Sequence, residues 1–130
     1  MHPYLAKILE SLRIKFSVSS LAQVGVLAAM KDVDHIRRSR EMVIEGRQYF
    51  YRHLDEMGLK YYPTQGNFIW MDFGGDAREI NNYLLNEGVI VRPGWVFGAP
   101  TCARVSISRE HDNAFFFDKL KKALKAGVGV

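Results

Sequence analysis

The sequence has a single cysteine, Cys102, among its 130 residues. One cysteine excludes an internal disulfide and a zinc cluster built from cysteines, and it suits a reducing compartment. No apolar run approaches the roughly 18 residues that a membrane helix needs. Met1–Glu10 also lacks the basic and then apolar order of a secretory signal. We therefore expect a soluble, cytoplasmic protein with no membrane partner.

Motifs for metal and nucleotide binding are missing as well. The four histidines are scattered, and none lies at metal-ligand spacing from another histidine or from Cys102. The stretch Gly94–Gly98 has neither the glycine spacing nor the Lys-Ser/Thr end of a phosphate-binding P-loop. We therefore expect no bound metal.

The charge is only weakly biased to one sign. The sequence has 18 lysines and arginines against 14 acidic residues, which gives a formal net charge of +4. The densest basic group, Arg37, Arg38 and Arg40, is followed at once by Glu41 and then by Glu45. This pattern is typical of a solvated, salt-bridged helix face, so we expect no nucleic-acid partner.

Hydrophobic residues make up 48% of the sequence and charged residues 25%, as in an ordinary globular domain. Apolar spacing and capping signals predict five helices. They run over Pro3–Leu12, from a capping box at Ser20 to about Met30, from Asp34 to Gly58, from Asp76 to Gly88, and from Ser108 to about Lys125. The helix from Ser20 is apolar or small on nearly every side, which predicts burial all round. Gly46 costs helix stability relative to alanine, which indicates close packing at that point.

Three stretches rich in aromatic and β-branched residues predict strands, at Asn67–Phe73, Val89–Arg92 and Arg104–Ser108. The order from Asn67 onward is strand, helix, strand, strand, helix. We expect an α/β fold, more narrowly an α+β sandwich. It would have a small mixed or antiparallel sheet with helices on one face, preceded by a long helical segment.

Two arginines are candidates for a binding site because side chains alternate between the faces of a strand. If Val105 and Ile107 face the helices, Arg104 faces away from them, and Arg92 lies opposite Val91 in the same way. Two guanidinium groups on the uncovered face would form a fork for carboxylate or phosphate oxygens. The residues alone leave both interpretations open and favour two exposed arginines without a ligand. Asn67 could orient a ligand through its amide or simply bond its own backbone.

Five stretches of the sequence resemble a known family in their order and spacing. They are Phe16–Gln23, Pro63–Phe68, Gly88–Pro93, Phe97–Pro100 and Arg104–Ile107. The family is that of the fold-type I pyridoxal-phosphate aminotransferases, and the resemblance is closest to its histidinol-phosphate aminotransferase branch. It covers nearly the whole chain, but only the C-terminal part of such an enzyme.

The resemblance implies a substrate-binding role for three residues of this chain. It implies that Arg104 binds the substrate's α-carboxylate, that Arg92 helps to hold the substrate's anionic end, and that Asn67 faces the cofactor side. Trp95, in the loop Pro93–Gly98, is expected near the substrate mouth. The substrate would be an amino acid or a phosphorylated amino alcohol.

The resemblance also implies a division of the chain and a set of partners. Residues 1–16 would be a helical arm leading from a missing large domain, residues 17–125 the small domain, and residues 126–130 a tail. The intact enzyme would hold pyridoxal 5'-phosphate and would form a homodimer.

The cofactor-binding lysine of the family stands in a Ser-Lys context, and none of the eight lysines here follows a serine. The family's Asp-x-Ala-Tyr motif, whose carboxylate meets the pyridine nitrogen, is also absent. We therefore expect no catalytic residue in this chain, no cofactor bound by it alone, and no activity without the rest of the enzyme. Two alternatives stay open: a decarboxylase of O-phospho amino acids on the same scaffold, and a non-catalytic binding module.

Overall fold

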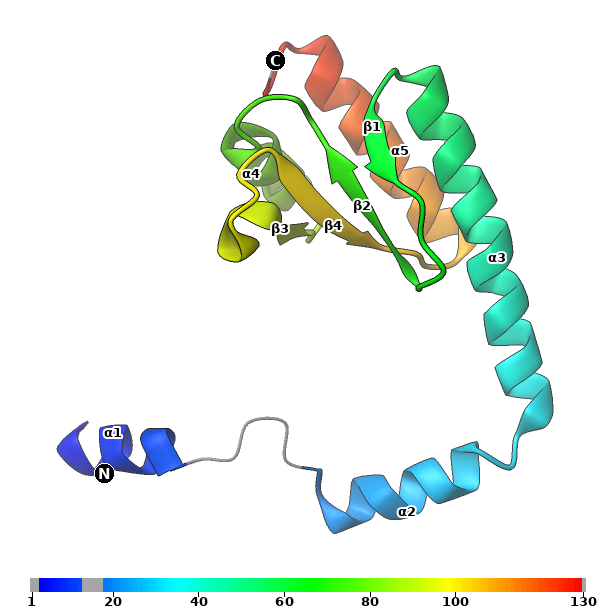
Figure 1. The fold of residues 1–130 in the computed structure, drawn as a ribbon, viewed down its shortest axis with the longest axis vertical. Helices are drawn as coiled ribbons and strands as arrows, with labels where there is room; N and C mark the ends of the chain where they lie inside the picture. Colours follow the sequence, from blue (N-terminus) through cyan, green and yellow to red (C-terminus); the bar gives the residue numbers. More distant parts are fainter. Residues whose placement is uncertain (1–2, 13–17, 130) are drawn as a thin grey trace. The chain divides into compact units, whose positions relative to one another are not determined.

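The computed structural model describes residues 3–12 and 18–129 (Figure 1). The chain divides into two compact units, residues 1–36 and residues 37–130. The first unit contains helix α1, Pro3–Leu12, helix α2, Ser20–Ala29, and the start of helix α3, Val33–Glu56. The second unit contains the rest of α3, the sheet and two further helices.

Helix α1 has the bounds that its apolar spacing predicts, whereas the predicted cap of α2 is wrong by one residue. The N-cap is Ser19, whose extended backbone suits that position and whose hydroxyl accepts a hydrogen bond from the Ala22 N–H at 3.2 Å. Ser20 is already helical. The Gln23 side chain reaches back to the Val18 carbonyl at 3.4 Å.

The prediction that α2 is buried on all sides is wrong. None of its residues is buried, and Leu21 and Leu27 are 81% and 64% exposed. The apolar residues that suggested burial are therefore a surface without a cover in the described part of this chain.

Helix α3 begins one residue earlier than predicted, because Asp32 rather than Asp34 caps it. The Asp32 carboxylate accepts a hydrogen bond from the His35 N–H at 2.9 Å. Phe50 and Leu54, four residues apart on one side of α3, are fully buried, while Ile36 near its start is exposed. Gly58 follows the helix with φ +66°, which confirms the predicted left-handed end.

Four strands form one antiparallel sheet in the order β1-β2-β4-β3 (Figure 1). They are β1, Lys60–Tyr62; β2, Phe68–Asp72; β3, Arg92–Pro93; and β4, Cys102–Ser106. The sequence did not predict β1, which has three residues, too few to show alternation.

The predicted strand at Val89–Arg92 is shortened to its last residue, joined by Pro93. The Val89 N–H donates instead to the Leu84 carbonyl at 2.8 Å. This hydrogen bond closes the end of the preceding helix and is not available for strand pairing. The alternation that suggested a strand survives in the packing. Val89 and Val91 pack against the core, while Ile90 is 86% exposed.

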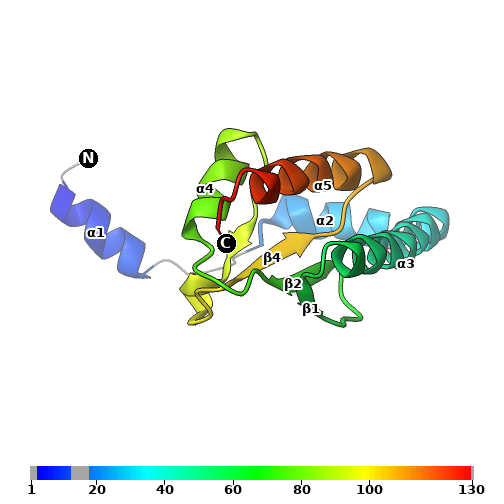
Figure 2. The ribbon, with the colours of Figure 1, turned by 90° about the horizontal axis from the view of Figure 1, so that it is seen from above.

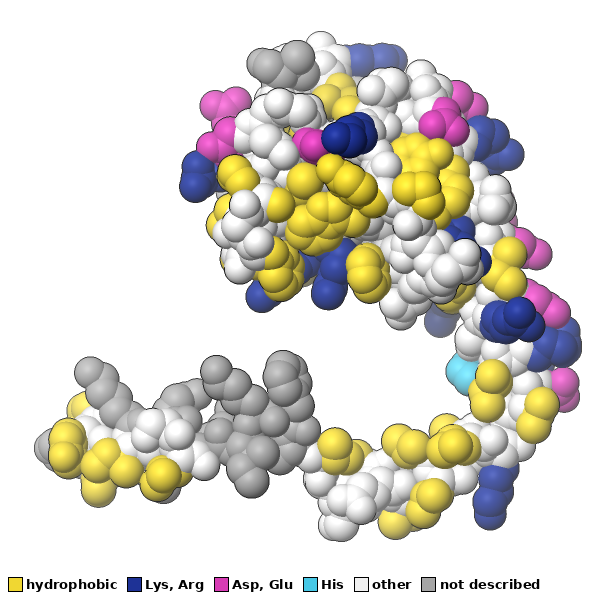
Figure 3. Space-filling model, viewed as in Figure 1, with side chains coloured by type: hydrophobic (Ala, Val, Ile, Leu, Met, Phe, Trp, Pro, Cys, Tyr) yellow, Lys and Arg dark blue, Asp and Glu magenta, His cyan; other side chains and the backbone are white. Residues whose placement is uncertain are grey.

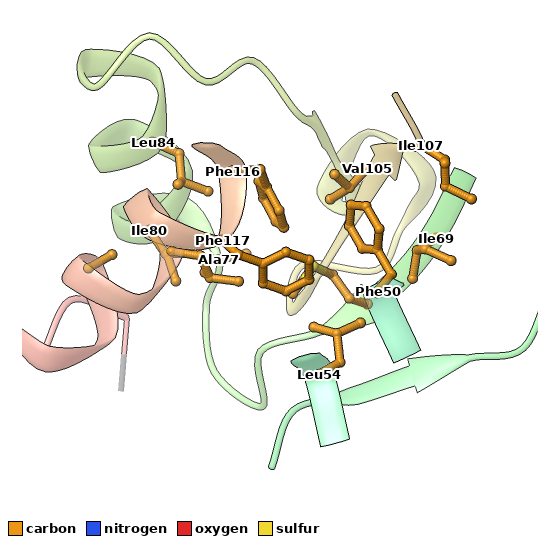
Figure 4. Close-up of a cluster of buried hydrophobic side chains, with 13 residues drawn as sticks. Phe50, Leu54, Ile69, Ala77, Ile80, Leu84, Val105, Ile107, Phe116 and Phe117 are labelled. Atoms are coloured by element: carbon orange, nitrogen blue, oxygen red, sulfur yellow. The ribbon is translucent and has the colours of Figure 1, made fainter. Parts of the chain in front are cut away.

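Three helices cover one face of the sheet, as predicted (Figure 2). They are α3, α4, Arg78–Asn86, and α5, Glu110–Lys125. Among the described residues, the buried side chains between helices and strands are apolar except for Asn113, and Figure 4 shows the apolar ones pointing toward one another. Its largest fully buried members are Phe50, Leu54, Ile69, Met71, Ile80, Leu84 and Leu120.

The close packing predicted at Gly46 of α3 is confirmed. A β-carbon at this position would collide with the Ile107 side chain just beyond β4. Because Gly46 belongs to α3, the Ile107 side chain lies on the helical side of the sheet. Side chains alternate along a strand, so Val105 faces the helices and Arg104 faces away from them.

The predicted caps of the last two helices differ in detail. Asp76 accepts a hydrogen bond from the Arg78 N–H at 3.0 Å, but the residue in the N-cap position of α4 is Ala77. At α5 the N-cap is Arg109, and the Ser108 hydroxyl donates to the Asp112 carboxylate at 2.7 Å instead of capping the helix.

Candidate functional site

Arg92 and Arg104 lie directly opposite each other across the β3–β4 pair. Antiparallel partners share a face, and Val105, the neighbour of Arg104, is buried among the helices. Both guanidinium groups therefore belong to the face of the sheet that α3, α4 and α5 leave uncovered. This confirms the predicted geometry of the pair, although it does not test the pair's role.

Aromatic rings surround the two arginines on this face. The Arg104 guanidinium carbon lies 5.2 Å from the centre of the Phe68 ring, and that of Arg92 lies 5.6 Å from the Phe97 ring. Trp70 pairs with Arg104 from β2, and its ring meets Phe97 edge-on at 5.8 Å. We call these five residues the open-face cluster.

Figure 3 looks onto the uncovered face of the sheet. Hydrophobic side chains gather over the strands there, with lysine and arginine side chains next to them. The face thus combines an apolar floor with positive charge, which suits a ligand with an anionic group.

Within residues 3–12 and 18–129, no carboxylate forms an ion pair with Arg92 or Arg104. Asp72 lies at the far end of β2, and its pKa is below its ordinary value, chiefly because it accepts a hydrogen bond from the Gly74 N–H. A hydrogen bond with Thr101 lowers the pKa further, desolvation raises it in part, and the charge of Lys60 has the smallest lowering effect. Because no described carboxylate pairs with Arg92 or Arg104, the two guanidinium groups keep their hydrogen-bond donors available for an anion.

Asn67 lies one residue before β2 and is exposed. Its carbonyl accepts a hydrogen bond from the Ile107 N–H at 2.9 Å, which extends the β2–β4 pairing by one position. The structure places Asn67 next to Phe68, but it gives the amide no contact with either arginine.

Sequence reasoning missed the aromatic members of the open-face cluster. The same alternation that placed Arg104 could have placed Phe68 and Trp70, because both alternate with the buried Ile69 and Met71 along β2. Phe97 gave no such signal, because it ends the 3-10 helix η1, Gly94–Phe97. Trp95 is partly buried and packs against the hydrophobic core, whereas the Phe97 ring meets Trp70 on the open face. The expected place of Trp95 near the substrate mouth stays a prediction.

The five residues of the open-face cluster include neither a lysine nor a carboxylate, the two groups that pyridoxal-phosphate chemistry uses. Imine formation needs a lysine amine, and Lys60, the lysine on this sheet face, lies on β1 with its amine 5.3 Å from the Tyr62 ring. The open-face cluster has no carboxylate that could meet a pyridine nitrogen. Its two arginines carry N–H donors of the kind that bind carboxylate or phosphate oxygens.

The described residues contain neither a candidate metal cluster nor a candidate membrane-spanning helix. No group of three or more histidine, cysteine or acidic side chains there is arranged to hold a metal ion. No helix in that part of the chain is both long enough and apolar enough to cross a membrane.

A small antiparallel sheet, helices on one face and an exposed arginine pair on the other define an α+β domain suited to binding an anionic small molecule. The model of the family described as aminotransferase class I and II matches residues 2–116. The chain belongs to this aminotransferase family.

Relatives with curated names agree with this family. The chain is 43% identical over 122 residues to histidinol-phosphate aminotransferase from Moorella thermoacetica, covering 94% of this chain and 32% of that protein. It is 39% identical over 123 residues to the enzyme of the same name from Bdellovibrio bacteriovorus, covering 95% and 33%. The chain thus spans about a third of the length of these relatives.

Solved structures share the fold. Histidinol-phosphate aminotransferase from Sinorhizobium meliloti, in complex with pyridoxal-5'-phosphate, superposes with a TM-score of 0.76 at 24% identity. The match covers 97% of this chain and 35% of that one. The enzyme of that name from Clostridium acetobutylicum gives a TM-score of 0.75 at 19% identity, over 95% of this chain and 38% of that one.

Proposed function

We propose that this chain is the C-terminal small domain of a pyridoxal-phosphate-dependent aminotransferase that acts on histidinol phosphate. The observation that carries the proposal is the pairing of Arg92 with Arg104 on the uncovered face of the sheet, where no carboxylate of the described residues forms an ion pair with either. The names of the relatives support transamination over the decarboxylation that the sequence left open.

In this proposal Arg104 binds the anionic group of the substrate. The planar guanidinium offers two parallel N–H donors to a carboxylate or phosphate, which a lysine ammonium does not reproduce. Arg92 adds a second positive charge from the neighbouring strand, and Asn67 faces the cofactor side. All three residues bind and orient, and none of them carries the chemical step.

The cofactor chemistry then belongs to the part of the enzyme outside this chain. Pyridoxal 5'-phosphate supplies the electron sink for amino-group transfer when it is bound. The amine that forms the imine and the partner of the pyridine nitrogen would both come from the large domain. On its own, the chain is expected to bind no cofactor and to be inactive.

The proposal also covers the division and the assembly of the chain. Residues 1–16 would lead from the large domain, residues 17–125 would form the small domain, and residues 126–130 would be a tail. The boundary between the first two falls within residues 13–17, which lie outside the described residues. The intact enzyme would be a cytoplasmic homodimer.

A chimeric enzyme tests the role of Arg104. Residues of this chain replace the matching third of the Moorella thermoacetica histidinol-phosphate aminotransferase, and transamination of histidinol phosphate is followed by steady-state kinetics. Arg104→Ala should lower kcat/KM by at least about 30-fold, equal to about 2 kcal/mol or more of lost charge-assisted bonding.

Arg109→Ala is the matched control for this substitution. Arg109 is exposed at the start of α5, away from the open face, so its replacement should leave kcat/KM unchanged. Equal effects of the two substitutions, or none from Arg104→Ala, would refute the proposed role.

A further inference from the structure

We propose that Phe68 and Phe97 are positioning residues that hold the guanidinium groups of Arg104 and Arg92 for the anion. The inference rests on the proposed function, in which these arginines bind the substrate's anionic group. Neither ring needs to touch the reacting atoms, since each acts through the arginine stacked on it.

The first half of the inference concerns Phe68 and Arg104. Arg104 pairs with Trp70 across the β2–β4 ladder, and Phe68 lies two residues away from Trp70 on the same face. The Arg104 guanidinium therefore leans diagonally along the strand to lie 5.2 Å from the Phe68 ring centre. A diagonal neighbour at this distance is within reach of an aromatic side chain, and the contact is within cation–π range.

The second half concerns Phe97, which comes from a turn rather than from a strand. Gly94 begins η1 so close to the Ala99 and Cys102 carbonyl groups that a β-carbon there would collide with both. Gly98 ends η1 with φ +79°. The turn is fixed at both ends, so it presents Phe97 in a defined place beneath Arg92, 5.6 Å from the guanidinium carbon.

Trp70 supports this arrangement from the neighbouring strand. Its ring meets the Phe97 ring at 5.8 Å and 63°, an edge-on contact favoured between aromatic side chains. Phe97 is 56% exposed, so this contact restrains a ring that has water over much of its surface.

An aromatic ring and a carboxylate can each hold a guanidinium group in place, but they differ in how well the held group can still bind an anion. A carboxylate occupies the N–H donors and adds a negative charge that competes with an incoming anion. An aromatic face holds the flat side of the guanidinium and leaves the N–H edge open. Elsewhere in this chain, Arg37 pairs with Glu41 at 3.0 Å, as expected for an arginine with a structural role.

The test measures the binding of inorganic phosphate to the 130-residue chain by NMR titration, with circular dichroism to confirm that each variant is folded. Phe68→Leu and Phe97→Leu should each weaken phosphate binding by about three- to sixfold, the effect expected from one cation–π contact at an exposed site. Phe68→Tyr, which keeps an aromatic face, should stay within about twofold of the parent chain. The upfield ring-current shifts of the arginine side-chain protons should vanish only in the leucine variants.

Phe115→Leu is the matched control. Phe115 is 42% exposed on α5 and carries the Lys119 ammonium 5.2 Å from its ring centre, so it has the same kind of contact away from the open face. Its replacement should leave phosphate binding unchanged.

Arg104→Gln separates the two proposals. If this variant binds phosphate as well as the parent chain, or if the parent chain binds none, the proposed function fails. If Arg104→Gln abolishes binding while both leucine variants keep parental affinity, the positioning role alone is refuted. Loss of the ring-current shifts without any loss of affinity refutes it too.

Discussion

Two positive charges lie directly opposite each other on Arg92 and Arg104, in a position where like charges destabilise an antiparallel pair. The cation–π contacts with Phe97 and Phe68 offset this repulsion in part. Selection for stability alone would place a carboxylate between them. The arrangement is therefore better explained by a ligand than by the fold.

Replacing Arg92 should separate affinity from stability. Arg92→Gln removes about 0.2–1 kcal/mol of repulsion and a cation–π contact of similar size, so the free energy of unfolding should change by less than about 0.5 kcal/mol. Phosphate affinity should fall severalfold, because half of the positive charge of the pair is lost. Urea denaturation and phosphate titration of the same variant measure both quantities, and a clear loss of stability with unchanged affinity would contradict a binding role.

The sequence predicted which side of the sheet each arginine occupies, because Val105 and Ile107 alternate with Arg104 and need burial. Alternation along β2 could also have put Phe68 on that side, but the sequence could not predict which rings contact the guanidinium groups. The place of Phe97 depends on the direction of a short turn, and the contact of Phe68 with Arg104 depends on the register between β2 and β4. Neither quantity is encoded in local periodicity.

At the scale of elements, the corner from β3 through η1 to β4 leaves no room for a side chain at Gly94. Gly94→Ala would place a methyl group against two backbone carbonyl groups, which cannot move aside as side chains can. We expect a loss of about 2 kcal/mol or more in the free energy of unfolding, measured by urea denaturation.

Gly75→Ala is the control for this corner. A β-carbon on Gly75 would make only an ordinary contact, 3.6 Å from the Gly129 carbonyl oxygen, and its backbone is not left-handed. Its effect should stay within about 0.5 kcal/mol. Equal effects of the two alanines would mean that the corner relaxes without cost.

The helices were predictable from sequence to within a residue or two, because their apolar stripes and end signals are local. The caps failed where two candidates were adjacent, as with Ser19 and Ser20, and only the backbone angles distinguish them. The strands were harder. β1 is held mainly by its pairing with β2, a contact that the local pattern of three residues does not show. Residues 89–91 form no strand pairing, and the Val89 N–H bonds instead to the Leu84 carbonyl at the end of α4.

At the scale of the whole molecule, α2 leaves an apolar surface without cover in the described chain. Surfaces of this kind drive association in water. The apparent mass of the chain in sedimentation velocity should therefore rise with concentration, and Leu21→Gln with Leu27→Gln should suppress the rise.

Leu85→Gln serves as the control, since Leu85 is an exposed leucine on α4, within the sheet-containing unit. Its replacement should leave the association unchanged. A parent chain that stays monomeric at all concentrations would favour the alternative of a free-standing binding module.

The unneutralised arginine pair has a practical consequence for anyone who handles this protein. An anion that binds the folded chain and not the unfolded one raises the midpoint of thermal unfolding in proportion to the logarithm of its concentration. The midpoint of thermal unfolding measured for this chain will then depend on which salt the buffer contains. Values taken in phosphate and in chloride solutions of equal ionic strength should not be interchanged.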